Sequence, residues 1–199
     1  TEFLVVHQGN PNATLYDGFS DGTWLLMKDI YELKNGENPD AWNYKDSGIH
    51  TYLNSTFLNL FDSDVLSNIR QVKIPYSSGT PGNDTVISGS KGLSAKIFLL
   101  SFCELGWIND TYPLMPMEGT CLDYFRGTST TDSKRIAYFN GEAEDWFIRT
   151  PAISSFNNNI YNLGMMYTSA SGTFYGTYGN TNARGMRPAL IVSPEMLVN

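Results

Sequence analysis

Trp146-Phe-Ile-Arg-Thr-Pro151 and Arg184-Gly-Met-Arg-Pro-Ala-Leu-Ile-Val192 are two stretches rich in the apolar residue types that favour β-strands. Between them lies a tract of Asn, Ser, Thr, Tyr and Gly, at about residues 154–182. We interpret the two stretches as scaffold. The tract between them is the part of the chain best suited to contact a ligand.

Apolar patterns elsewhere in the chain predict the remaining elements. The spacing of Ile49 and Leu53 predicts a helix that is capped by Asp46 or Ser47 and breaks near residues 54–56. A second short helix is expected to begin at residues 62–64. Strands are expected at 2–8, 23–30, 71–75, 96–101, 146–149, 160–167, 173–178 and 187–192. Two early helices followed by many short strands favour an α+β domain with a mostly antiparallel sheet and a loop-rich C-terminal half.

The composition limits the classes of partner. The chain has 199 residues, of which 41% are apolar and 17% charged, with a net charge of −7. This negative charge argues against nucleic acid, whose phosphates need a basic surface, and against an anionic membrane. No apolar run approaches the ~20 residues that cross a bilayer, so we expect no membrane insertion. Charge-poor surfaces built from Asn, Ser, Thr and Gly are typical of extracellular and virion proteins.

Several motifs together resemble a domain family of unassigned function from Gram-positive gut bacteria and their phages. They include Gly22-Thr-Trp-Leu-Leu-Met-Lys-Asp-Ile30, Trp146-Phe-Ile-Arg-Thr-Pro151 and Gly185-Met-Arg-Pro-Ala-Leu190. The usual signature of that family is Trp-Leu-Arg-Ser-Pro followed by Gly-Val-Arg-Pro-Ala. The resemblance implies a single domain over residues 1–199 with a C-type-lectin-like fold. That family is also similar to the variable proteins of diversity-generating retroelements, in which error-prone copying mutates a C-terminal binding tract.

The resemblance places the ligand contacts in the tract at about 154–182. Tyr supplies rigid contact area, and Ser, Gly and Asn supply adaptable hydrogen bonds, as in antibody loops. The alternative is a solvated, turn-rich sheet with no ligand. The expected contact residues are Asn157, Asn158, Asn159, Tyr161, Tyr167, Ser169, Phe174, Tyr175, Tyr178, Asn180 and Asn182.

Three residues of the flanking stretches are expected to be structural. Arg149 and Arg187 could contact an anion or a glycan, but a guanidinium that bonds loop carbonyls or a carboxylate is the favoured interpretation. Trp146 is expected in the core rather than on a ligand platform.

No catalytic or metal-binding pattern is evident. His7 and His50 have no nucleophile and orienting acid at a readable spacing, so we expect no enzyme. Calcium would need the oxygen-rich segments 36–40 or 107–110, which do not lie where a lectin calcium motif would. We therefore expect no metal and no cofactor. Cys103 and Cys121 could form one disulfide or remain as thiols.

The hypothesis from the sequence is a non-enzymatic adhesion module on a phage tail or bacterial surface. It would bind a host cell-surface protein or glycan, and it could form homo-oligomers within a larger assembly. The alternative function is a structural virion or surface-assembly component that uses the same face for subunit contacts.

Overall fold

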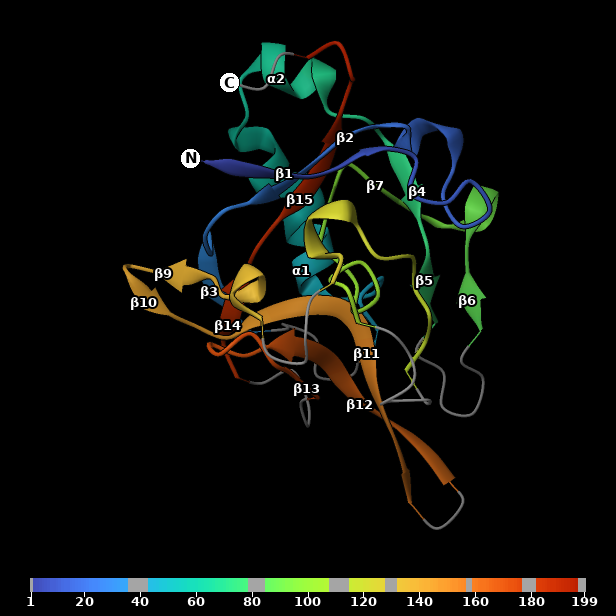
Figure 1. Ribbon diagram of the computed structural model, residues 1–199, viewed down its shortest axis with the longest axis vertical. Coiled ribbons are helices and arrows are strands. Elements are labelled where there is room, and N and C mark those ends of the chain that lie inside the picture. Colours follow the sequence, from blue (N-terminus) through green and yellow to red (C-terminus); the bar gives the residue numbers. More distant parts are fainter. Residues whose placement is uncertain are drawn as a thin grey trace.

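A computed structural model describes residues 2–35, 43–78, 85–107, 115–127, 132–156, 159–176 and 182–196. Most elements are short strands (Figure 1). In chain order the strands are β1 (Phe3–Gly9), β2 (Gly22–Met27), β3 (Glu32–Lys34), β4 (Val72–Ile74), β5 (Tyr76–Ser77), β6 (Val86–Ile87), β7 (Leu93–Ala95), β8 (Ile97–Phe98), β9 (Tyr138–Phe139), β10 (Glu142–Ala143), β11 (Trp146–Phe156), β12 (Asn159–Thr168), β13 (Phe174–Gly176), β14 (Arg184–Met186) and β15 (Ala189–Val192).

Two larger sheets organise these strands. One has the order β1-β2-β15-β8, and the other has the order β13-β12-β11-β14-β3. Three two-stranded pairs, β4-β7, β5-β6 and β9-β10, complete the described sheets. Among these pairings β11 and β14 run parallel, and the others are antiparallel. β14 lies in one large sheet and β15 in the other, so the segment 184–192 connects the two.

β11 and β12 form a long hairpin that extends away from the rest of the molecule (Figure 1). β11 continues to Phe156, well beyond the expected end near residue 149. The pairing with β12 shifts register between Phe147 and Pro151. There the Arg149 N–H donates to the Leu100 carbonyl instead of to β12. A bulge of this kind lets a strand pass through a proline, which has no N–H for the ladder.

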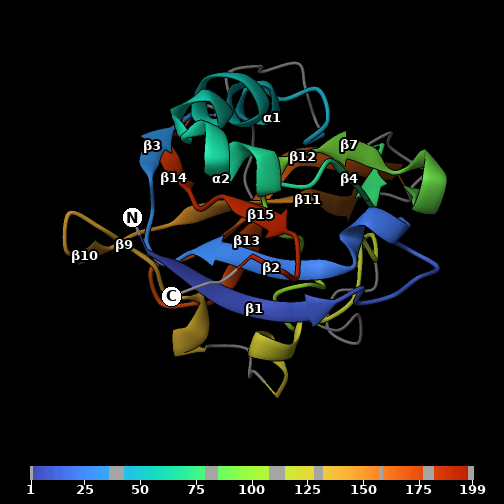
Figure 2. The ribbon, with the colours of Figure 1, turned by 90° about the horizontal axis from the view of Figure 1, so that it is seen from above.

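The predicted pair of early helices is wrong. A single helical run of 13 residues passes through α1 (Gly48–Tyr52), the π-helical turn η2 (Leu53–Phe57) and the 3-10 turn η3 (Leu58–Leu60). α2 (Ser63–Asn68) adds only six residues. α1 and α2 lie together on one side of the four-stranded sheet (Figure 2). The remaining helical turns are the 3-10 turns η1 (Gly18–Ser20), η4 (Gly89–Lys91), η5 (Asp123–Phe125) and η6 (Ser133–Arg135).

The break expected at residues 54–56 is absent because Asn54 has partners elsewhere. Its side-chain amide donates to the Ile97 carbonyl at 2.8 Å, and its oxygen accepts from the Lys96 and Ile97 N–H groups. A polar side chain that the pattern assigns to a helix end thus fastens the helix to β8. The C-type-lectin-like α+β assignment is accordingly replaced by a small, sheet-rich fold.

The core follows the apolar stretches quoted from the sequence. Trp24 on β2 is fully buried and meets the rings of Tyr16 and Phe98 edge-on at 5.3 and 5.7 Å. All four residues of β15 are buried, as expected for a strand between β2 and β8. Gly185 on β14 is required by packing, because a Cβ there would lie within 2.8 Å of three Ile30 side-chain atoms.

Candidate functional site

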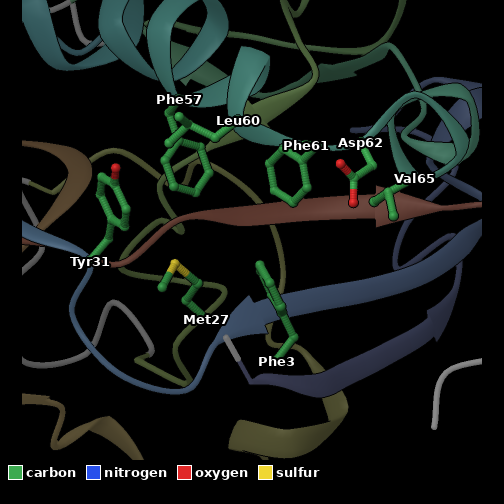
Figure 3. Close-up of a pocket in the computed structure, with 8 residues that line it drawn as sticks. All are labelled: Phe3, Met27, Tyr31, Phe57, Leu60, Phe61, Asp62 and Val65. Atoms are coloured by element: carbon green, nitrogen blue, oxygen red, sulfur yellow. The ribbon is translucent and has the colours of Figure 1, made fainter.

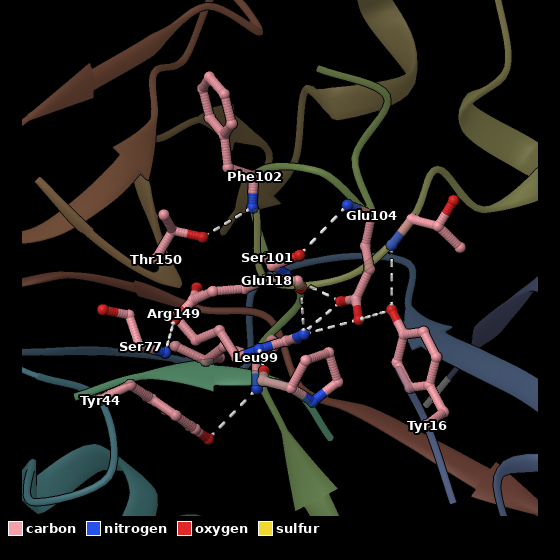
Figure 4. Close-up of polar contacts among 12 residues, drawn as sticks. Tyr16, Tyr44, Ser77, Leu99, Ser101, Phe102, Glu104, Glu118, Arg149 and Thr150 are labelled. Carbon is pink, nitrogen blue, oxygen red and sulfur yellow. Dashed lines mark hydrogen bonds and ion pairs between the residues drawn. The ribbon is translucent and has the colours of Figure 1, made fainter. Parts of the chain in front are cut away.

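Arg149, in the first of the two flanking stretches, is fully buried and bonded on every side (Figure 4). It makes two 2.7 Å contacts with the Glu104 carboxylate, which is also fully buried. Its other donors reach the carbonyls of Pro75, Leu99 and Glu118. Burial lowers the pKa of Arg149, but the Glu104 carboxylate outweighs it, and the pKa stays above its ordinary value. Arg149 therefore ties loops to β11 and offers no exposed atom to a ligand.

The carboxylates beside Arg149 have distinct partners. Glu104 accepts from the Tyr16 hydroxyl at 2.7 Å and from the Ser101 N–H at 2.9 Å. Glu118 accepts from the Ser77 N–H. Burial raises the pKa of Glu118 to about 7, although Arg149 opposes the shift. This group of buried polar residues joins five segments of the chain, so it acts in the scaffold.

Arg187 and Trp146 form a second buried contact. The Arg187 guanidinium lies 5.0 Å from the Trp146 ring and donates to the carbonyls of Met27 and Lys28. Burial lowers the pKa of Arg187 to about 10. The Trp146 indole N–H donates to the Arg135 carbonyl at 2.8 Å. Both side chains are at most 1% exposed, so neither is available to a ligand in this structure.

On the five-stranded sheet two tyrosines and an arginine form a stack in which Tyr175 is exposed and the other two are partly buried. Tyr167 on β12 pairs in register with Tyr175 on β13, and their rings stack with centroids 5.7 Å apart and an interplanar angle of 26°. The Arg184 guanidinium, from β14, lies 3.9 Å from the centre of the Tyr167 ring. Tyr175 is 51% exposed. We call Arg184, Tyr167 and Tyr175 the Arg–Tyr stack.

Arg184 has unused hydrogen-bonding capacity. Among the described residues, no acceptor lies within hydrogen-bond distance of its Nε or NH1 atoms. The nearest carboxylate oxygen belongs to Asp145, at 3.8 Å from Nε. Asp145 itself accepts from the Ala170 N–H at 3.0 Å, and its carbonyl accepts from the Gly185 N–H. Asp145 therefore fixes the ends of β12 and β14 that carry the stack.

The expected contact residues divide into four groups. Tyr167 and Tyr175 meet in the Arg–Tyr stack, and Asn182 is exposed two residues before Arg184. Asn159 and Tyr161 belong to β12, whose described part here is the backbone alone. Four further expected residues lie outside the described part of the chain; they are Asn157, Asn158, Tyr178 and Asn180.

Two expected contact residues have other positions. Phe174 is 3% exposed and packs against Phe102 and Trp107 in the core, because it alternates with the outward-facing Tyr175 along β13. Ser169 closes the turn between β12 and β13, where its hydroxyl accepts from the Thr173 N–H at 3.2 Å. Phe174 is therefore removed from the candidate contact set, and Ser169 shapes the turn beside it.

Sequence reasoning did not include Arg184 and Asp145 in the site. Arg184 belongs to the C-terminal stretch that is interpreted as scaffold, and Asp145 lies outside both stretches and the tract. The signal in the sequence is position alone, since Asp145 directly precedes the first scaffold stretch and Arg184 is the first residue of the second, next to the tyrosine-rich tract. Such a pair can flank an aromatic surface and hold a guanidinium over a ring.

The residues considered for chemistry lie apart from the stack. His7 Nδ1 is 2.8 Å from the Asp123 carboxylate, and His50 packs against Tyr44. Cys103 and Cys121 are free thiols, and burial raises the pKa of Cys103 to about 12. Within the described ranges, no three His, Cys, Asp or Glu residues are grouped to hold a metal ion.

The calcium candidate at 36–40, and the candidate at 107–110 except for Trp107, lie outside the described residues. In the part of the chain that the structure describes, no helix is both long and apolar enough to cross a bilayer.

The sequence was compared with models of known protein families. The model of a family described as "Domain of unknown function (DUF6273)" matches residues 21–194. The chain belongs to this family. The match runs from the start of β2 past the end of β15, so the DUF6273 region contains both large sheets except β1, as well as the Arg–Tyr stack. No curated protein and no solved structure matches the chain.

Proposed function

We propose that this DUF6273 domain is a non-enzymatic binding module whose contact surface is centred on the Arg–Tyr stack. The observation that carries the proposal is the position of Arg184 on Tyr167, with Tyr167 stacked in turn on the half-exposed Tyr175. The residues of the stack come from three strands of one sheet, β13, β12 and β14, so they form a surface rather than an isolated side chain.

Tyrosine and arginine are the residue types that dominate binding energy in protein interfaces. Their rings and guanidinium are held here before binding, which reduces the ordering cost of association. The Arg184 Nε and NH1 atoms are buried, so Arg184 contributes by holding the Tyr167 ring in place, and the exposed Tyr175 supplies the contact area. These features favour a host cell-surface protein as the partner. A surface glycan is the second candidate, and the experiment below distinguishes the two.

The setting that we propose is the exterior of a phage tail or of a bacterial cell. The support is compositional: only 17% of the residues are charged, and the tract at 154–182 is rich in Asn, Ser, Thr and Tyr. Diversification of the tract by a retroelement stays a prediction. A neighbouring reverse-transcriptase gene with a template repeat that matches the codons of residues 146–192 would test it.

The test is the binding of the fluorescently labelled domain to a panel of intact Gram-positive gut bacteria. Tyr175→Ala is expected to weaken binding at least about tenfold, the range of an interface hot spot. The matched control is Tyr138→Ala, because Tyr138 on β9 is similarly exposed, at 47%, but lies outside the stack. Arg184→Gln is expected to weaken binding while Tyr175 remains.

The outcomes separate the candidate partners. Loss of binding after protease treatment of the cells identifies a protein, and loss after periodate treatment identifies a glycan. Equal binding by the wild type and Tyr175→Ala would refute the stack as the contact surface. The assembly alternative predicts a different result, namely self-association of the wild type in sedimentation that Tyr175→Ala abolishes.

A further inference from the structure

A groove on the other large sheet lies away from the Arg–Tyr stack. It has a volume of about 330 Å³ and runs between the helical segment, which comprises the helical run and the start of α2, and the strands β1 and β2 (Figure 3). This volume falls at the lower end of the range for small-molecule sites. The groove therefore has room for a compact ligand.

The two walls of the groove come from distant parts of the chain. Phe57 and Leu60 line it from the helical segment, and Phe3 and Met27 line it from β1 and β2 (Figure 3). Phe57 also meets the Tyr31 ring edge-on at 4.7 Å. Leu60 is 60% exposed, so its side chain forms a rim that water reaches. The lining offers several aromatic rings to a bound molecule.

Asp62 is the charged residue of the lining. In Figure 3 its carboxylate points from the helical wall between Phe61 and Val65 toward the side on which Phe3 lies. Asp62 stands at the N-cap of α2, where an aspartate ordinarily accepts from a backbone N–H, yet its side chain makes no capping bond. Among the described residues, no hydrogen bond or ion pair engages this carboxylate.

The cations adjacent in sequence to the groove have other partners. Lys28 follows the groove residue Met27 and is bonded to Glu2 at 2.6 Å. Arg70, just after α2, donates to the carbonyls of Phe19 and Asp21. The exposed Asp62 carboxylate is therefore not paired with a described protein cation, it lies beside aromatic rings, and the protein as a whole carries −7. Both the carboxylate and the ring faces attract a cation.

We infer that this groove is a binding site for a small amphipathic cation, with an apolar or aromatic body between the two walls and an ammonium group at Asp62. The site is independent of the Arg–Tyr stack, which lies on the other large sheet. Its ligand would be selected by charge as well as by apolar fit.

The test uses three probes with the same body and different charge: 4-phenylbutylammonium, 4-phenylbutanol and 4-phenylbutyrate. Binding is followed by NMR of methionine methyl groups, because Met27 lines the groove. The wild type is expected to bind the ammonium about fivefold more tightly than the alcohol, the range of one exposed ion pair, and the carboxylate most weakly.

Asp62→Asn is expected to reduce the preference of the ammonium over the alcohol to within about twofold. Asp64→Asn is the matched control, because Asp64 is an exposed carboxylate in the first turn of α2 that does not line the groove. Asp64→Asn should still bind the ammonium more tightly than the alcohol. Phe61→Ala should weaken the binding of all three probes.

Two results would overturn the inference. One is the absence of any Met27 shift with the ammonium up to about 10 mM, which corresponds to negligible affinity. The other is equal binding of the ammonium and the alcohol by the wild type, a comparison that needs no variant. If Asp62→Asn still prefers the ammonium over the alcohol, the ammonium group does not bind at Asp62. That result would also refute the proposed site.

Discussion

At the scale of single residues, the protein keeps ionisable groups in its interior and satisfies them with specific partners. Arg149 and Glu104 are both fully buried, and each also bonds to backbone groups of other segments. Breaking such a pair leaves one charge buried without compensation, which is more costly than replacing both members. Among the described residues, Glu118 beside them has no comparable ion pair, and its raised pKa makes the interior sensitive to pH.

Glu118 gives a prediction about stability and pH. Its pKa is about 7 in the folded protein, against an ordinary value of 4.5. The folded state therefore binds more protons than the unfolded state between these pH values, so the free energy of unfolding falls as pH rises through that window. The expected loss is on the order of 3 kcal/mol between about pH 4.5 and 7.5.

Urea unfolding of the wild type and Glu118→Gln across this range measures the effect. The difference in unfolding free energy between the two proteins should change with pH, and most of the change should fall below pH 7. Glu142→Gln is the control, because Glu142 on β10 is exposed and its replacement removes the same charge. Parallel pH curves for all three proteins would contradict the prediction.

At the scale of elements, the helical run depends on one side chain for its attachment to the sheet. Asn54 reaches both the N–H and the carbonyl of Ile97 on β8 and also bonds the His50 carbonyl within its own helix. No hydrophobic pattern reveals these bonds, because the partners are more than 40 residues apart. The residue types at 54–56 alone therefore predict a helix end, whereas the structure has a continuous helical run there.

Asn54→Ala is expected to destabilise the protein by about 2–3 kcal/mol, because it leaves the backbone groups of Lys96 and Ile97 without partners. Ser55→Ala is the matched control and should change stability by less than about 0.5 kcal/mol, since the Ser55 hydroxyl is exposed and bonds only within the helix. Chemical denaturation gives both values. A similar cost for the two variants would show that Asn54 does not anchor the helix.

The same contrast between local and long-range information applies to the other elements. The stretches 146–151 and 184–192 are recognisable because apolar residues concentrate in them, and they lie in β11, β14 and β15. Their bulge, their extension to Phe156 and their division between two sheets depend on partners elsewhere in the chain. In the candidate site, residue type indicates Tyr167 and Tyr175, whereas the contribution of Arg184 requires the strand order.

At the scale of the whole molecule, the two large sheets are joined closely enough to unfold together. β14 and β15 belong to different sheets and are separated only by Arg187 and Pro188. Arg187 also bonds the end of β2 while it packs on Trp146 of β11. Loss of either sheet would expose groups that the other sheet buries. The protein should therefore behave as one cooperative unit.

Equilibrium unfolding in urea tests this expectation with two signals. Tryptophan fluorescence reports on the four tryptophans, among them Trp24 and Trp146, one in each large sheet, and far-UV circular dichroism follows the backbone. We expect the two transitions to coincide and to fit a two-state model. Two separated transitions would mean that the sheets are independent folding units.

The position of β15 also has a consequence for biosynthesis. β15 lies between β2 and β8, although it follows both in the chain by more than 90 residues. While the ribosome is still translating the segments between them, the β1–β2 hairpin has emerged with one hydrogen-bonding edge open. Unpaired edges of this kind pair readily with other chains. The nascent protein is thus most exposed to aggregation before residues 189–192 leave the ribosome, and a chaperone that shields β2 would protect it during that interval.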